Sequence, residues 1–335
     1  MKILLLECES PSSLQFLKFY NRKKEVEIVC GASSRLPIVL FSRFKKKTYY
    51  YPKTYYPFQL SSESIKKFTT RIEKIVTKEK IDYIIPQTEA TLIPLLMYPH
   101  LKKYLLSPPL PVVNILHDKK TFFDTLNNFS PRSFKIPRIY KEENNMKFPI
   151  ILKPRKGMGT KFVRILRNKE EFSREIGKLK WRRKNFIFQE YIPSKIKLTL
   201  NFFVTKEEKI KRVLSFRRIS MTRLETILKE LEEFFKRIGY FGFASPQFLI
   251  YKNQLFLLEI NPRLSYYYYG IDFNAGLYEG FHENLIEGKN VDKKVKIIEF
   301  PPPLFEASKL YLEETKDPLP VFTTYLFTTL FFLKG

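Results

Sequence analysis

Short apolar runs alternate with segments of helical periodicity over residues 1–115. Runs such as 3–7 and 82–86 are largely apolar, which is typical of strands buried on both faces. Strand patterns lie at 3–7, 26–30, 38–41, 82–86 and 112–115, and helix patterns lie at 12–20, 64–78 and through residue 92. This alternation predicts an α/β domain with a parallel sheet and helices on both faces. The segment 86–89 follows a strand end, where ligands of open α/β sheets usually bind.

The pattern changes after residue 115. Residues 116–136 are predicted to begin with a helix that Asp118 caps. Short strands around one helix at 169–178 then predict an antiparallel sheet, and hence an α+β lobe. We expect these strands at 148–153, 162–166, 186–190, 198–204 and 210–215. A helix at 222–238, strands at 244–251 and 255–260 joined by the turn Lys252-Asn253, and a helix at 271–287 are expected to follow.

The 335 residues suffice for two or three compact domains. We expect an α/β domain at 1–115, a small lobe with its linking helix at 116–215, a larger lobe at 216–290 and a C-terminal extension at 291–335. The sequence does not define the structure of that extension.

The net charge is +26, from 60 Lys and Arg against 34 Asp and Glu. Such a surface attracts anions, including nucleotides, nucleic acid, anionic lipid and acidic carrier proteins, although scattered lysines can equally serve solubility. The two cysteines, Cys8 and Cys30, are predicted to be buried free thiols, and the three histidines lack the spacing of a zinc site. No secretory signal is visible and the late apolar run at 321–333 is too short to span a bilayer, so we expect a cytoplasmic protein without a transmembrane segment.

A basic loop with two glycines follows the strand pattern that ends at Lys153. Gly157 and Gly159 would let backbone N–H groups approach phosphate oxygens, and Lys153 would supply a fixed positive charge. The glycine spacing fits neither a P-loop nor a dinucleotide fingerprint. A plain basic β-hairpin is the alternative explanation.

Oxygen-bearing side chains gather at the end of the predicted strand 255–260. Glu259 and Asn261 are two residues apart and therefore point to one face, and Gln247 on the preceding strand can reach the same place. A few protein oxygens of this kind suit Mg²⁺, which completes its shell with substrate phosphates. Arg263 lies close enough to pair with a phosphoryl or carboxylate group. An ordinary polar strand end before a proline turn is the alternative.

These motifs, in this order, resemble the ATP-grasp superfamily. The resemblance rests on Asp118-Lys119, on Lys153-Pro154 with its two glycines, on Gln189-Glu190-Tyr191-Ile192-Pro193 and on Glu259-Ile260-Asn261-Pro262-Arg263, and it covers about residues 1–290. It is strongest for the branch of carbamoyl-phosphate synthetase halves, biotin carboxylase and carboxylate–amine ligases. It implies a Rossmann-like pre-ATP-grasp domain followed by two lobes that clamp ATP.

The resemblance also implies a role for each candidate residue. Lys119, Lys153, Gly157 and Gly159 would contact phosphates; Glu190 and the Ile192 backbone would hold adenine; Gln247, Glu259 and Asn261 would hold Mg²⁺ or Mn²⁺; Arg263 and Lys153 would be catalytic. The implied reaction is phosphorylation of a carboxylate, free or carried by an acidic protein, to an acyl phosphate that an amine captures.

Two departures from the family pattern leave other functions open. Ser194-Lys195-Ile196-Lys197 carries no carboxylate where relatives contact ribose, and four tyrosines, 266–269, follow Arg263 where small residues are common. A degenerate ATP-grasp protein that binds nucleotide without turnover is therefore one alternative. A basic nucleic-acid-binding protein is another, although no DNA- or RNA-binding module is recognisable.

Overall fold

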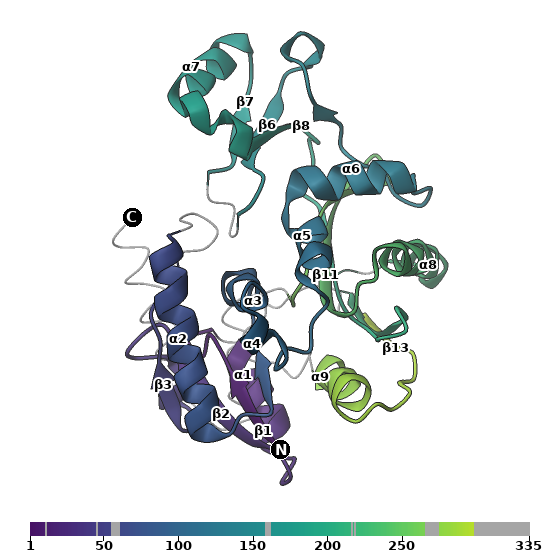
Figure 1. Ribbon diagram of the computed structural model, residues 1–335. Helices are drawn as coiled ribbons and strands as arrows, with labels where there is room; N and C mark the ends of the chain where they lie inside the picture. Colours follow the sequence, from purple (N-terminus) through teal and green to yellow (C-terminus); the bar gives the residue numbers. More distant parts are fainter. Residues whose placement is uncertain are drawn as a thin grey trace.

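The structure is a computed structural model that describes residues 1–10, 12–44, 46–54, 61–157, 162–215, 217, 219–264 and 275–297. Figure 1 shows an N-terminal domain at the lower left, a small lobe at the top and a larger lobe at the right. The helices α5 (Leu110–His117) and α6 (Lys119–Phe129) lie between these bodies. The predicted combination of a parallel N-terminal sheet with antiparallel sheets is confirmed.

Four parallel strands form the N-terminal sheet in the order β3-β2-β1-β4. The elements are β1 (Lys2–Leu5), α1 (Ser12–Tyr20), β2 (Glu27–Ala32), β3 (Thr48–Tyr50), α2 (Ser62–Glu79), β4 (Tyr83–Ile85), α3 (Glu89–Leu96) and α4 (Pro99–Lys102). Helix α2 turns Phe68, Ile72 and Ile75 inward, as its periodicity predicts. Cys8 and Cys30 are buried free thiols, as expected.

Two predicted strands of this domain are wrong. Residues 38–41 form a 3₁₀ turn, Ile38–Phe41, and residues 112–115 lie inside helix α5. Short apolar runs do not distinguish strand from helix by periodicity alone. Pro111 in the first turn of α5 favours the helix, because its ring presets the backbone angle where no N–H bond is needed. The strand β3, which directly follows the basic cluster 43–47, was not predicted.

The small lobe holds an antiparallel sheet of order β5-β8-β6-β7. Its elements are β5 (Ile139–Tyr140), a 3₁₀ turn (Glu143–Asn145), β6 (Ile150–Pro154), β7 (Arg164–Leu166), α7 (Lys169–Leu179), a 3₁₀ turn (Lys180–Asn185) and β8 (Phe186–Glu190). Helix α7 packs through Phe172 on Phe188, with ring centroids 5.4 Å apart. This contact closes a small core of its own.

The large lobe is built on a five-stranded sheet of order β12-β11-β9-β10-β13. Its elements are β9 (Lys197–Val204), β10 (Ile210–Ser215), α8 (Met221–Ile238), β11 (Gly242–Tyr251), β12 (Gln254–Asn261), α9 (Ala275–Phe281), a π-helical turn (His282–Ile286) and β13 (Lys294–Ile297). Helix α8 buries Leu224, Ile227 and Phe234 against this sheet. The prediction that 198–204 and 210–215 share the small-lobe sheet is therefore wrong, since both strands pair within this one. The domain boundaries themselves stay predictions.

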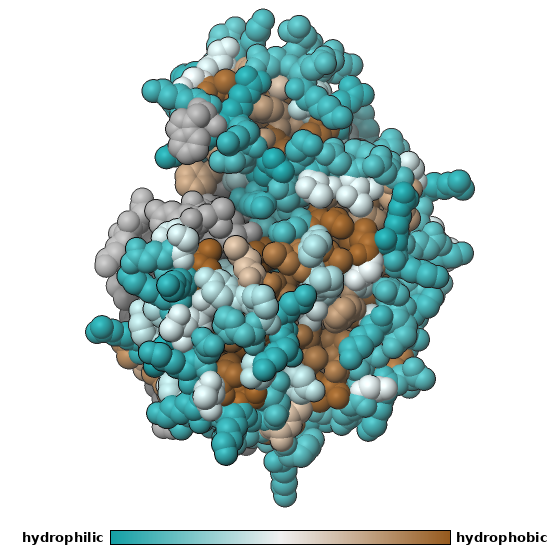
Figure 2. Space-filling model, viewed as in Figure 1, coloured by the Kyte–Doolittle hydropathy of each residue, from teal (hydrophilic) through white to brown (hydrophobic). Residues whose placement is uncertain are grey.

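The N-terminal domain and the large lobe share one core. Phe16 of α1 packs edge-on against Tyr278 of α9 at 5.3 Å, and Phe203 and Leu214 of the large sheet belong to the same cluster. Figure 2 shows apolar surface gathered in the middle of this face, below the small lobe. Within the described ranges, no helix has the length and apolar character needed to cross a bilayer.

Candidate active site

Asp118 organises the entrance to α6. It ends α5 and caps α6, where its Oδ1 accepts hydrogen bonds from the backbone amides of Lys120 and Thr121 at 3.0 and 3.4 Å. Arg155 at the end of β6 holds the same carboxylate with two bonds, of 3.0 and 2.7 Å. Burial opposes ionisation, but Arg155 and the amide donors keep the pKa of Asp118 below its ordinary value. The predicted N-cap is confirmed, and it fixes Lys119 as the first residue of the helix.

Lys119 faces the end of β12. Its Nζ lies 3.7 Å from Oε2 of Glu259, and Oε1 of Glu259 accepts a 3.3 Å hydrogen bond from the Asn261 side-chain amide. The structure thus brings together one predicted phosphate ligand and two predicted metal ligands. Burial opposes ionisation of Glu259, but Lys119 and Lys153 hold its pKa below the ordinary value.

Lys153 is buried beside this group, with 7% of its surface exposed. Its Nζ donates to the carbonyl of Leu258 at 3.4 Å and lies 5.2 Å from the centre of the Phe123 ring. Burial, and then the charge of Lys119, lower the pKa of Lys153 to about 7, against a smaller opposing effect of Glu259. An anion arriving here would restore its charge.

Gln247 stands opposite Glu259 in the pairing of β11 with β12, and a register shift follows directly after it. Such irregularities re-aim side chains at functional sites. The donors at this strand end are one carboxylate and two amide oxygens, from Glu259, Asn261 and Gln247. Among the described residues no group of three or more His, Cys, Asp and Glu could hold a metal ion. These three ligands suit Mg²⁺ that is also bound by phosphate oxygens. They are too few for a metal site made by protein ligands alone.

Arg263 connects this strand end to the N-terminal domain. Its Nε donates to Oε2 of Glu89 at 2.9 Å, and its Nη2 lies 3.5 Å from Oδ1 of Asn261. Glu89 is the first residue of α3, whose N-cap is Thr88, and only 2% of its surface is exposed. Burial opposes its ionisation, but Arg263 holds the pKa of Glu89 below its ordinary value. A continuous line of polar groups therefore runs from Lys119 through Glu259, Asn261 and Arg263 to Glu89.

Two buried residues of this region were missed from the sequence. Glu89 belongs to the segment after β4 that was expected to lie near ligands, but its partner is 174 residues away. His117 is 5% exposed, and burial lowers its pKa to about 4, so it is neutral at physiological pH. The position after a strand end marked the segment of Glu89 but not its contact with Arg263, and no periodicity or spacing marks His117 as part of a site.

The predicted adenine ligands lie where β8 leads into β9. Oε2 of Glu190 accepts the backbone amide of Arg138 at 3.0 Å, and the carbonyl of Ile192 accepts the amide of Ser194 at 2.8 Å. Among the described residues, no hydrogen bond joins Glu190 or Ile192 to the Lys119–Glu259 group. Their role toward adenine stays a prediction.

The predicted phosphate loop leaves the site at the end of β6. The carbonyl of Arg155 accepts the backbone amide of Lys119 at 2.9 Å, so the start of this loop is fixed to α6. Gly157 follows two residues later, whereas Gly159 lies outside the described residues. The four tyrosines at 266–269 also lie outside them.

Comparison with known proteins identifies the family of the domain that carries this site. The family model described as an ATP-grasp domain matches residues 116–265, a range that contains every site residue predicted from the sequence. The chain is an ATP-grasp domain protein. It is distantly related to the carbamoyl phosphate synthase large chain of Helicobacter pylori (strain J99), with 25% identity over 225 residues, covering 58% of this chain. The ATP-grasp protein spans about a fifth, 21%, of that relative's length.

Solved structures share the ATP-grasp fold at low identity. A biotin carboxylase complex with β,γ-ATP from Campylobacter jejuni has a TM-score of 0.61 at 14% identity, over 78% of this chain and 65% of its own. The biotin carboxylase domain of Hydrogenobacter thermophilus 2-oxoglutarate carboxylase, with MgADP, ADP and bicarbonate, has a TM-score of 0.58 at 15% identity. The match covers 79% of this chain and 64% of that domain. L-amino acid ligase from Bacillus licheniformis has a TM-score of 0.60 at 12% identity, over 83% of this chain and 73% of its own. At these identities the likeness shows the fold alone.

Proposed function

We propose that this protein is an ATP-dependent ligase that phosphorylates a carboxylate to an acyl phosphate, which an amine or similar nucleophile captures with release of ADP and phosphate. The observation that carries the proposal is the polar line from Lys119 through Glu259 and Asn261 to Arg263. It joins the oxygens of Glu259 and Asn261, which are suited to binding a metal, to an arginine, and Lys153 lies beside them. ATP-grasp relatives have been solved with ADP and magnesium.

Each group has a task in this reaction. Lys119 and Lys153 would neutralise the phosphate oxygens of ATP, and Arg263 would hold the carboxylate or the phosphoryl group in transfer. Glu259, Asn261 and Gln247 would hold Mg²⁺, which when bound withdraws charge from the phosphate oxygens. Glu190 and the backbone at Ile192 would receive adenine.

The bonds made and broken follow from this arrangement. A carboxylate oxygen bonds to the γ-phosphorus, and the bond from that phosphorus to ADP breaks. The nucleophile then bonds to the acyl carbon, and the carbon–oxygen bond to phosphate breaks. Enclosure between the lobes would keep water from the acyl phosphate. The acid is free or carried by an acidic protein that the +26 charge would attract.

Calorimetric titration of ATP, with and without Mg²⁺, tests the proposal on the wild type and on Glu259→Gln. Glu225→Gln is the matched control, because Glu225 is exposed on α8. We expect Mg²⁺-dependent binding that weakens at least about tenfold in Glu259→Gln and is unchanged in Glu225→Gln.

Equal ATP binding by Glu259→Gln and Glu225→Gln would contradict a metal site at this strand end. No binding by the wild type would refute nucleotide binding itself. Binding without ADP formation for any acid tested would instead favour a nucleotide-binding protein without turnover.

A further inference from the structure

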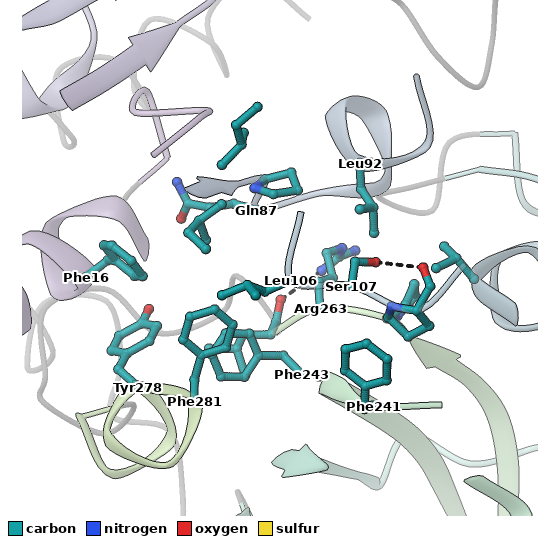
Figure 3. Close-up of a pocket in the computed structure, with 18 of the residues that line it drawn as sticks. Phe16, Gln87, Leu92, Leu106, Ser107, Phe241, Phe243, Arg263, Tyr278 and Phe281 are labelled. Carbon is teal, nitrogen blue, oxygen red and sulfur yellow. Dashed lines mark hydrogen bonds between the residues drawn. The ribbon is translucent and has the colours of Figure 1, made fainter. Parts of the chain in front are cut away.

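An apolar pocket lies between the N-terminal domain and the large lobe, beside Arg263 (Figure 3). One wall comes from α1 and from the segments after β4, with Gln87, Leu92 and Leu106. The other wall comes from the start of β11 and from α9, with Phe243 and Phe281. The pocket thus sits where the two bodies share their core.

Aromatic rings of the two bodies pack on one another to shape this pocket. Phe243 stacks on Phe281 at 5.0 Å, and it meets Tyr278 edge-on at 5.9 Å. Tyr278 in turn meets Phe16 of α1 at 5.3 Å. Mutually packed rings form a surface that exists before any ligand arrives, so an apolar group can leave water without rearranging the walls.

The polar groups of the pocket have distinct positions. The side-chain amide of Gln87 donates to the carbonyl of Leu6 at 2.6 Å and accepts from the hydroxyl of Ser12 at 2.5 Å. Among the described residues that line the pocket, Arg263 alone carries a charge. A ligand with one anionic end and an apolar body matches this distribution.

Arg263 also connects the pocket to the proposed phosphoryl-transfer site, because its Nη2 lies 3.5 Å from Oδ1 of Asn261. Three basic side chains, those of Lys119, Lys153 and Arg263, share this region. They face two carboxylates, those of Glu259 and Glu89. These basic side chains favour an anion at the end of the pocket nearest Glu259 and Asn261.

We propose that this pocket binds the aliphatic chain of the carboxylate substrate and that Arg263 receives its carboxylate. The inference rests on the proposed ligase function and adds the class of acid. The cavity volume is about 80 Å³. Since an apolar cavity of about 150 Å³ admits benzene, this one suits a short chain of about three to five carbons.

Binding of 3-methylbutanoate, butanoate, acetate and succinate, measured by saturation-transfer NMR in the presence of MgADP, tests the inference. On the wild type we expect 3-methylbutanoate to bind at least about tenfold more tightly than acetate or succinate. Leu106→Trp should fill the cavity and remove that preference while acetate binds as before. Leu36→Trp is the control, because Leu36 is 59% exposed and does not line the pocket.

Leu106→Ala gives an independent test should the larger variant not fold. It widens the pocket and should move the preference toward hexanoate. Equal or tighter binding of succinate to the wild type would overturn the inference, as would an unchanged preference in both Leu106 variants.

ADP release is measured in parallel and separates the two proposals. Preferential binding of 3-methylbutanoate without ADP release for any acid would support the pocket and contradict the ligase function. ADP release with succinate alone would support the ligase and contradict the pocket.

Discussion

The ion pair between Glu89 and Arg263 connects the N-terminal domain to the strand end that bears the site. The two side chains are 3% and 12% exposed, and Nε lies 2.9 Å from Oε2. At an effective dielectric constant of about 20, this separation gives about 6 kcal/mol of Coulomb attraction before the cost of desolvation. Removing one partner of such a buried pair costs about 3–5 kcal/mol, because the other charge is left unpaired.

We therefore expect Glu89→Gln to lower the melting temperature by about 4–7 °C in scanning calorimetry. Glu225→Gln, on the exposed face of α8, should leave it unchanged. Adding Arg263→Gln to Glu89→Gln removes the unpaired charge, so the double variant should lose at least about 2 kcal/mol less than the sum of the single losses. If the stability losses of the two single variants are additive, Glu89 and Arg263 do not stabilise each other, and the pair is not the connection between the two bodies.

Three further predictions concern the site and its support. ATP affinity should fall by up to about tenfold per pH unit above about pH 7, because anion binding requires protonated Lys153, whose pKa is about 7; calorimetry should show proton uptake that Lys153→Met abolishes. Asp118→Ala should lower stability by about 1–2 kcal/mol through loss of the α6 cap, and Asp118→Asn should retain most of the cap, as measured by thermal melts. Gly280→Ala should lower the free energy of unfolding by about 1–3 kcal/mol, because its Cβ would lie 2.7 Å from Cγ of buried Arg212. Gly177→Ala should not destabilise, because outside its chain neighbours and the backbone of its own helix no atom lies within 4 Å of the added Cβ.

Local patterns were sufficient for most elements and for part of the site. The cap at Asp118 was predicted from one residue type before a helical period, and the hairpin of β11 and β12 from two apolar strands around a polar turn. The same pattern placed Gln247, Glu259 and Asn261 together, since strand geometry alone decides which side chains share a face.

Long-range pairing explains what the sequence could not supply. No local pattern in β9 and β10 indicates that β9 pairs with β11, or that β10 lies between β9 and β13, so the sequence placed both strands in the wrong sheet. The contact of Glu89 with Arg263 spans 174 residues, and no single motif contains both. The pocket likewise depends on rings from α1, β11 and α9, which only the folded chain brings together.

Activation of a carboxylate as an acyl phosphate transfers an oxygen atom from the acid to phosphate, and this transfer can be measured. The acid that gives the highest ADP release would be labelled with ¹⁸O in its carboxylate and turned over with ATP, Mg²⁺ and an amine. Phosphorus NMR would then report the isotope in the released phosphate. We expect one ¹⁸O atom in each phosphate, since the carbon–oxygen bond breaks on capture by the amine. Phosphate that carries oxygen from solvent water, with none from the acid, would contradict it.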